Sequence, residues 1–143
     1  MDRLLVLCAA LALAAGVGWW LRRPGRGLAH AQRGAGADAA PTLSPADLDH
    51  PLGSRATLVQ FSTAFCQPCR ATRVILTDVS GQVPGVVHVE VDAESNLDLV
   101  RRLDVRRTPT VLVLDGDGRV VRRASGQPRK ADVIAALGTV VSA

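Results

Sequence analysis

The chain has 143 residues, a net charge of +4 and only 3% aromatic residues, so it has room for one ordinary domain and not for two. Five of the basic residues but only two of the acidic ones lie in residues 1–40, and the shortage of aromatic stacking residues argues against single-strand nucleic-acid binding. Three cysteines are too few for a disulfide-rich secreted scaffold or for a zinc site with four cysteine ligands.

The first element in chain order is an apolar segment of eighteen residues, Leu4 to Leu21, which contains no charged residue. As a helix that rises ~1.5 Å per residue it would be about 27 Å long, close to the ~30 Å hydrocarbon core of a bilayer. Two tryptophans close the segment and two arginines follow it, an order typical of the membrane interface. The pattern predicts a transmembrane anchor over residues 1–21.

The arginines around this segment predict its orientation. Only Arg3 precedes the apolar run, whereas four arginines follow it before residue 34, and this excess favours a cytoplasmic C-terminal side. A cleaved export signal is the alternative, because Ala29-His30-Ala31 has the small-residue spacing of a cleavage site. That site lies about eight residues beyond the apolar run, behind three arginines, so we expect an uncleaved anchor and a cytoplasmic domain.

Residues 22–43 form the next segment, which is rich in glycine, alanine and arginine and shows no apolar periodicity. This composition predicts a flexible linker. We then expect a folded domain over residues 44–143. It should open with a short helix from Ser44 through Asp49, because serine is a favoured N-cap and Pro45 suits the first helical position.

The remaining elements follow the two periodicities of secondary structure. Compact β-branched and aromatic runs predict strands at 57–61, 86–91, 111–114 and 120–121. Apolar residues at helical spacing predict helices at 69–81, 97–103 and 133–141. The run Asp115-Gly116-Asp117-Gly118 predicts a hairpin between the last two strands. The order β, α, β, α, β, β, α favours an α/β fold with a mixed central sheet and helices on both faces.

Two of the cysteines, Cys66 and Cys69, stand where the first strand gives way to a helix. Unpaired N–H groups and the positive end of the helix dipole stabilise an anion there, so we expect a depressed pKa for the Cys66 thiol. Cys69 falls one turn later on the buried face, where its sulfur can reach that of Cys66. Pro68 is tolerated between them because N–H groups of the first turn have no helical partner. The spacing favours a redox pair in which Cys69 resolves a mixed disulfide formed on Cys66.

Half of a zinc site is the competing explanation of the two cysteines. The third cysteine, Cys8, lies inside the apolar segment, and the histidines are scattered along the chain at His30, His50 and His88. No ligand set at metal-binding spacing results. We therefore expect a site without a metal or another cofactor.

Four further motifs accompany the cysteine pair. In chain order the five motifs are Leu58-Val59-Gln60-Phe61, Cys66-Gln67-Pro68-Cys69, Val91-Asp92, Thr108-Pro109-Thr110 and Gly126. With this order and spacing, the chain resembles the thioredoxin family over residues 54–141. The resemblance implies a thioredoxin fold and protein-disulfide oxidoreductase activity, with Cys66 and Cys69 as the catalytic pair. It also implies that Pro109 is cis and faces the cysteines, and that the backbone of Thr108 pairs with an extended substrate.

Four positions depart from the family pattern. Phe65 replaces a tryptophan before the first cysteine, and Gln67 replaces a glycine after it. Gln60 stands where the family keeps a buried aspartate, and His88 where it keeps that aspartate's lysine partner. We expect these two side chains to lie together beneath Cys69, where a neutral His88 could accept the proton that Cys69 loses. An ordinary strand histidine beside a core glutamine is the alternative.

The resemblance implies a monomeric protein that reduces disulfides in other proteins and is reduced in turn by thioredoxin reductase or another thiol donor. Its substrate-contacting residues would be Phe65, Gln67, Pro68, Thr108 and Pro109. Arg106 and Arg107 would be a solvated pair, with a substrate-selecting patch as the alternative. Two other functions stay open: the same exchange chemistry on the exported side, in cytochrome assembly or oxidative folding, and a redox-silent peptide-binding module.

Overall fold

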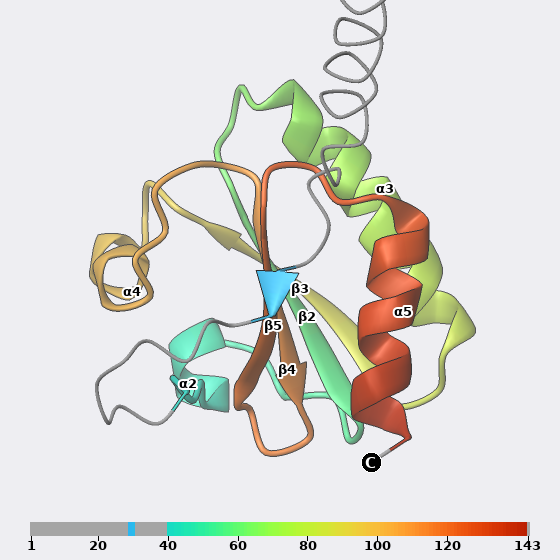
Figure 1. Ribbon diagram of the computed structural model, residues 1–143. Helices are drawn as coiled ribbons and strands as arrows, with labels where there is room; N and C mark the ends of the chain where they lie inside the picture. The colour runs from blue at the N-terminus through green and yellow to red at the C-terminus, as the bar shows by residue number, and fades with distance from the viewer. Residues whose placement is uncertain (1–28, 31–39, 143) are drawn as a thin grey trace, which may run out of the picture.

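The structure is a computed structural model that describes residues 29–30 and 40–142 (Figure 1). The predicted anchor over residues 1–21 lies outside the described residues, as does most of the predicted linker over residues 22–43. Among the helices that the structure describes, none combines the length and the apolar character that a membrane span requires.

A five-stranded mixed sheet forms the centre of the domain, in the order β1-β5-β4-β2-β3. The strands are β1 (Ala29–His30), β2 (Ala56–Ser62), β3 (Val86–Asp92), β4 (Thr110–Asp115) and β5 (Val120–Ser125). β2 and β3 run parallel, with Gln60 opposite Glu90, and every other pair of neighbours is antiparallel. The predicted α/β fold with a mixed sheet is confirmed.

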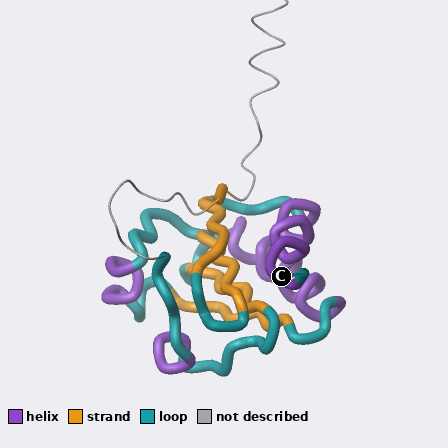
Figure 2. Tube along the Cα trace, turned by 60° about the horizontal axis from the view of Figure 1, so that its bottom comes forward, coloured by secondary structure: helices purple, strands orange, loops and turns teal. Residues whose placement is uncertain are grey.

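Helices cover both faces of this sheet, as Figures 1 and 2 show. They are α2 (Pro45–Leu48), α3 (Gln67–Gln82), α4 (Leu97–Arg102) and α5 (Lys130–Val141). One apolar cluster joins α3 and α5 to the sheet, around Leu58, Leu76 and Val133. The other joins α2 and α4 to the opposite face, around Phe61 and Leu99. The sheet is thus the middle of three layers.

The predicted start of α2 and the predicted hairpin between β4 and β5 are confirmed, and local residue types explain both. Ser44 caps α2, and its side chain and backbone N–H exchange hydrogen bonds with Asp47 in a capping box. The hairpin between β4 and β5 closes through the N–H of Gly118, which donates to the Asp115 carbonyl at 3.0 Å. Gly118 has a φ of 81°, a left-handed conformation that favours glycine.

Two elements, β5 and α5, extend beyond their predicted ranges by three residues or more at one end. β5 continues to Ser125 because Arg122 and Arg123 maintain the ladder with β4, although charged residues interrupt the apolar pattern there. The guanidinium of Arg123 donates to the carbonyl oxygen of Leu103, which fixes this strand from the side. α5 begins at Lys130 rather than at residue 133, because its first turn is mostly exposed and carries no apolar periodicity.

Parts of the predicted linker belong to the sheet. Ala29–His30 pairs with β5 as an antiparallel strand. Thr42 bridges Arg119, and Leu43 is fully buried with its N–H donating to the Gly118 carbonyl at 2.9 Å. The folded domain therefore starts before residue 44, and Leu43 belongs to the apolar cluster on the α2 and α4 side of the sheet.

Candidate active site

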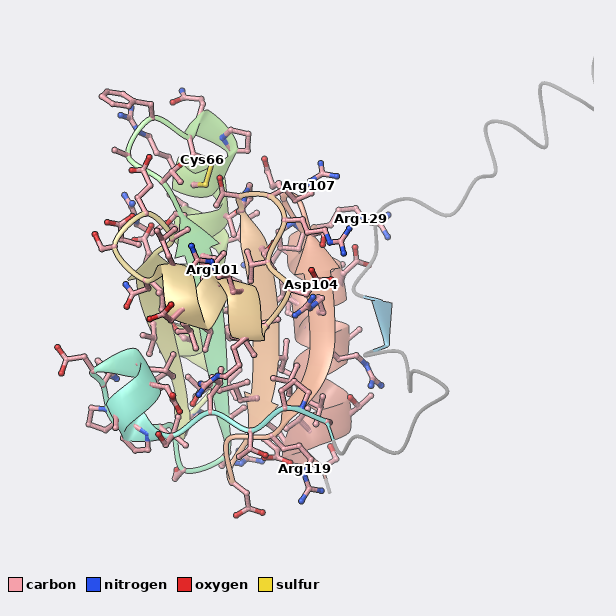
Figure 3. The ribbon with its side chains drawn as sticks, turned by 90° about the vertical axis from the view of Figure 1, so that its left-hand side faces the viewer. Cys66, Arg101, Asp104, Arg107, Arg119 and Arg129 are labelled. Atoms are coloured by element: carbon pink, nitrogen blue, oxygen red, sulfur yellow. A yellow bond between two sulfur atoms is a disulfide. The ribbon has the colours of Figure 1, made fainter. Side chains whose placement is uncertain are left out.

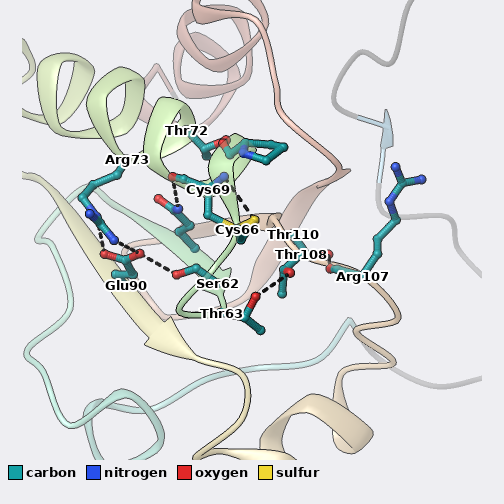
Figure 4. Close-up of a disulfide and its surroundings, with 12 residues drawn as sticks. Ser62, Thr63, Cys66, Cys69, Thr72, Arg73, Glu90, Arg107, Thr108 and Thr110 are labelled. Atoms are coloured by element: carbon teal, nitrogen blue, oxygen red, sulfur yellow. Dashed lines mark hydrogen bonds and ion pairs between the residues drawn. A yellow bond between two sulfur atoms is a disulfide. The ribbon is translucent and has the colours of Figure 1, made fainter.

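The two cysteines form a disulfide at the start of α3, just beyond the carboxyl end of β2 (Figure 4). Cys66 is the N-cap of the helix, and its Sγ accepts a hydrogen bond from the N–H of Cys69 at 3.2 Å. Their Cα atoms lie 5.2 Å apart. The predicted pairing and the predicted place at the strand-to-helix junction are both confirmed.

Exposure distinguishes the two sulfur-bearing residues. Cys69 is only 1% exposed, whereas Cys66 is half-buried. Phe65, next to Cys66, is 99% exposed, and Gln67 and Pro68 are exposed on the other side. An incoming molecule can therefore contact Cys66 directly, whereas the buried Cys69 is not accessible from solvent.

The segment Thr108–Pro109, which leads into β4, lies near the disulfide (Figure 4). The Thr108–Pro109 peptide bond is cis, as the resemblance implied, and Pro109 is buried while Thr108 is half-buried. The hydroxyls of Thr108 and Thr63 lie 3.3 Å apart and connect this segment to the loop that leads into Cys66. The sheet thus brings together two segments that are far apart in the sequence.

A chain of hydrogen bonds runs beneath Cys69. The fully buried Gln60 donates from Nε2 to the carbonyl oxygen of Cys69 at 2.8 Å. Its Oε1 lies 3.2 Å from Nε2 of His88, and Nδ1 of His88 lies 3.3 Å from the Thr77 hydroxyl. Because an amide oxygen can only accept, Nε2 of His88 must carry the proton and donate. Burial lowers the pKa of His88, and this favours the neutral ring.

The expected contact between Gln60 and His88 is therefore present. Gln60 meets the main-chain oxygen of Cys69 and not its sulfur, so His88 is linked to the backbone of the cysteine. A role of these two residues as a proton relay stays a prediction.

A second polar cluster beside the site was not predicted. The Glu90 carboxylate accepts two hydrogen bonds from the Arg73 guanidinium, at 2.6 and 2.8 Å, and one from the Ser62 hydroxyl at 2.5 Å. Bonding to Arg73 lowers the pKa of Glu90, which therefore stays ionised. The sequence does contain a signal for this cluster. Ser62 and Glu90 follow Gln60 and His88 by two residues in their strands, so they lie on the same face of the sheet.

A shallow cavity of about 300 Å³ opens next to this cluster. Its lining residues come from the ends of β2 and β3, from the loop after β2 and from α3: Ser62, Thr63, Ala64, Arg73, Glu90 and Asp92. In residues 29–30 and 40–142, no group of three or more potential metal-binding side chains occurs. The expectation of a site without metal or cofactor stays a prediction.

Comparison with known proteins gives the family. A family model described as Thioredoxin matches residues 42–139, which is more than half of the chain. The chain belongs to the thioredoxin family. Thioredoxin H5 of Oryza sativa subsp. japonica is 29% identical over 72 residues, covering 50% of this chain and 53% of that protein. Thioredoxin H-type of Picea mariana is 28% identical over 94 residues, covering 62% of this chain and 74% of that one.

Solved thioredoxin structures share the fold. Thioredoxin f from spinach chloroplast superimposes with a TM-score of 0.57 at 20% sequence identity, covering 72% of this chain and 89% of that one. The chain spans only about half the length of some curated thioredoxins that it matches, 53% of the rice protein and 44% of one from Arabidopsis thaliana.

The four residues that the resemblance singled out as departures from the family pattern lie around the cysteine pair. Gln60 and His88 contact each other under Cys69, and Phe65 and Gln67 flank Cys66 on the surface. The buried polar positions are all satisfied: within the described residues, no buried side-chain nitrogen or oxygen lacks a hydrogen-bond partner. Gln60 and His88 thus belong to a buried polar site whose groups are hydrogen-bonded.

Proposed function

We propose that this protein is a thioredoxin-type thiol-disulfide oxidoreductase that reduces disulfides in other proteins. One observation carries the proposal: a disulfide at the N-terminus of α3 lies close to a cis Thr108–Pro109 segment, which contacts the loop before Cys66 through Thr63 (Figure 4). The partly exposed Cys66 is the attacking residue, and the buried Cys69 is the resolving one.

The geometry supports a two-step exchange. In the reduced protein, the N–H of Cys69 and the helix dipole stabilise the Cys66 thiolate, which attacks one sulfur of a substrate disulfide. A new bond forms to Cys66 as the substrate bond breaks, and the departing thiolate takes a proton from solvent. Cys69, as a thiolate, then attacks Sγ of Cys66, restores the Cys66–Cys69 disulfide and releases the second substrate thiol. Two electrons pass to the substrate, so an external thiol donor must reduce the protein again.

Reduction of insulin by dithiothreitol, followed by turbidity, tests this activity. The full chain should accelerate the reaction, and Cys66→Ser should reduce the rate to that of dithiothreitol alone, because the attacking thiolate is lost. Cys8→Ser is the matched control, since it removes a cysteine outside the pair and should retain the rate. An equal rate for Cys66→Ser and the unmodified chain would contradict the proposal and favour a redox-silent peptide-binding domain.

We further propose that the protein is anchored by residues 1–21, with its domain in the cytoplasm and thioredoxin reductase or another thiol donor as its reductant. The apolar run of residues 4–21 and the arginine excess that follows it support this arrangement. The full chain should fractionate with membranes, and alkaline phosphatase fused after residue 40 should be inactive in a bacterial host. An active fusion would reverse the orientation and favour the exported function.

A further inference from the structure

Charged side chains are distributed unevenly around the disulfide. Arg107 directly precedes Thr108 and is exposed. Figure 3 shows Arg107 and Arg129 toward the end of the domain that holds Cys66, whereas Arg119 lies at the opposite end. Arg107 thus carries a positive charge on the residue directly before Thr108.

Arg107 is held in place beside Pro109. Its carbonyl oxygen accepts a hydrogen bond from the Thr110 hydroxyl at 2.6 Å. Its guanidinium lies over Gly126, where an added Cβ would be 3.5 Å from Nη2 and 3.9 Å from Cζ. The N–H of Gly126 in turn donates to the Pro109 carbonyl at 2.7 Å. A hydrogen bond thus holds the backbone of Arg107, and its guanidinium lies near Gly126, whose N–H donates to the Pro109 carbonyl.

Among the residues that the structure describes, Arg107 differs from Arg106 and Arg129 in forming no ion pair. Arg106 pairs with Asp104 and Arg129 pairs with Asp132, each at 2.8 Å. Arg107 forms no ion pair within residues 29–30 and 40–142. Its donor groups therefore remain available to a carboxylate, which a guanidinium can bind through two parallel hydrogen bonds.

The end of β3 and the loop that leads to α4 carry negative charge instead, on Asp92 and Glu94. The Asp92 carboxylate accepts hydrogen bonds from the Ser95 hydroxyl and the Glu94 N–H, and no cation pairs with it or with Glu94 in the part of the chain that the structure describes. Asp92 lines the cavity together with Thr63 and Ala64, close to the loop that enters Cys66. An acidic segment would be repelled on this side of the site and attracted by Arg107 on the other.

We infer that the disulfide substrates of this site carry an acidic residue next to the reacting cysteine, and that Arg107 binds its carboxylate. The inference rests on the proposed function, because it concerns the substrate of that same exchange. The occupant is an acidic extended peptide whose backbone pairs with Thr108 while its carboxylate lies against the guanidinium over Gly126.

Symmetric disulfides of one short peptide test this selectivity, with the cysteine flanked by glutamates, glutamines or lysines. The full chain, kept in solution with a non-ionic detergent, is reduced, freed of reductant and mixed with each disulfide. One protein disulfide and two peptide thiols form per turnover, and chromatography after acid quenching measures them. Each rate is divided by the rate with dithiothreitol alone, which corrects for the intrinsic reactivity of the peptide. Arg107→Gln is the test variant, and Arg119→Gln is the control with the same change in charge.

At low salt the glutamate peptide should react about five-fold faster than the glutamine peptide, the effect expected from one exposed ion pair. The lysine peptide should be the slowest. Arg107→Gln should abolish the preference, Arg119→Gln should retain it, and added salt should weaken it. Equal corrected rates for the three peptides, or a preference that survives in Arg107→Gln, would overturn the inference and leave the proposed function intact. Failure to reduce any of the peptides would instead contradict the proposed function.

Discussion

The two faces of β2 and β3 differ in what they present near the cysteine pair. Toward α4, the side chains at the ends of the strands nearest the cysteines are apolar: Val59, Phe61, Val89 and Val91. Toward α3, the same strands begin with apolar residues, Leu58 and Val86. They then become polar as they approach Cys69, at Gln60, Ser62, His88 and Glu90.

The α4 face of the sheet therefore contributes mainly to stability, whereas the α3 face also carries the polar groups next to the redox site. Burying a polar group costs free energy unless it is hydrogen-bonded, so the polar end of the α3 face is tolerated only because each group has a partner. Those partners lead to the Cys69 backbone and to Arg73 on α3. We therefore expect substitutions on the α4 face to change mainly the free energy of unfolding, and substitutions on the α3 face to change the redox site as well.

The largest effect on stability should come from Phe61→Ala on the apolar face. Phe61 is fully buried, so truncation leaves a cavity and should lower the free energy of unfolding by about 3–5 kcal/mol. Urea denaturation of the oxidised protein measures this change. Phe65→Ala is the matched control, because that side chain is 99% exposed and should cost little. Similar losses for the two variants would mean that the α4 face is not the packed core described above.

A smaller loss should follow from Gln60→Ala on the polar face. The variant leaves the Cys69 carbonyl and the His88 N–H without their partner, which should lower the free energy of unfolding by ~1–3 kcal/mol. It should also change the rate at which a mixed disulfide on Cys66 is resolved, measured by stopped flow. Gln67→Ala, at an exposed position in the first turn of α3, should change stability less. A Gln60→Ala protein with unchanged stability and resolution rate would remove the distinction between the faces.

The pH dependence of stability provides a finer comparison. Burial lowers the pKa of His88 below its usual 6.5, so the unfolded chain binds this proton more readily than the folded protein does. The stabilisation by neutral His88 is therefore complete above pH 6.5. It is lost as the pH falls from 6.5 through the lower pKa that His88 has in the folded protein. The free energy of unfolding should decrease from about pH 7 to pH 5, and His88→Gln should remove this part of the slope. Loss of the same slope in His50→Gln, the control outside the hydrogen-bonded chain, would contradict the assignment to His88.

The sequence was sufficient to predict the features that depend on local signals. The strand at β2, the N-cap at Ser44 and the hairpin at Gly118 each follow from residue types in one short window. The Cys66–Cys69 pairing also follows from local spacing at a strand-to-helix junction. The cis Thr108–Pro109 bond was predicted only through the family resemblance, because no short-range pattern distinguishes it from an ordinary proline turn.

Features that depend on the packing of distant segments were missed. The bonding of Glu90 to Arg73 and Ser62 joins three elements, and a glutamate on a strand otherwise indicates a solvated position. The pairing of Ala29–His30 with β5 lies in a segment whose composition predicted a flexible linker. The position of the Arg107 guanidinium near Gly126 depends on the cis segment and the β5–α5 turn lying side by side. In each case the deciding partner is far away in the sequence.

The redox assignment is tested most directly by alkylating the reduced protein with iodoacetamide at pH 7 and mapping the modified cysteines by mass spectrometry over time. Cys66 caps α3 with a hydrogen bond from the Cys69 N–H, whereas Cys69 is 1% exposed. Helix-end stabilisation of the thiolate and better access should make Cys66 react at least ~10-fold faster than Cys69. Equal rates for the two cysteines, or faster modification of Cys69, would contradict the account of Cys66 as the attacking thiol.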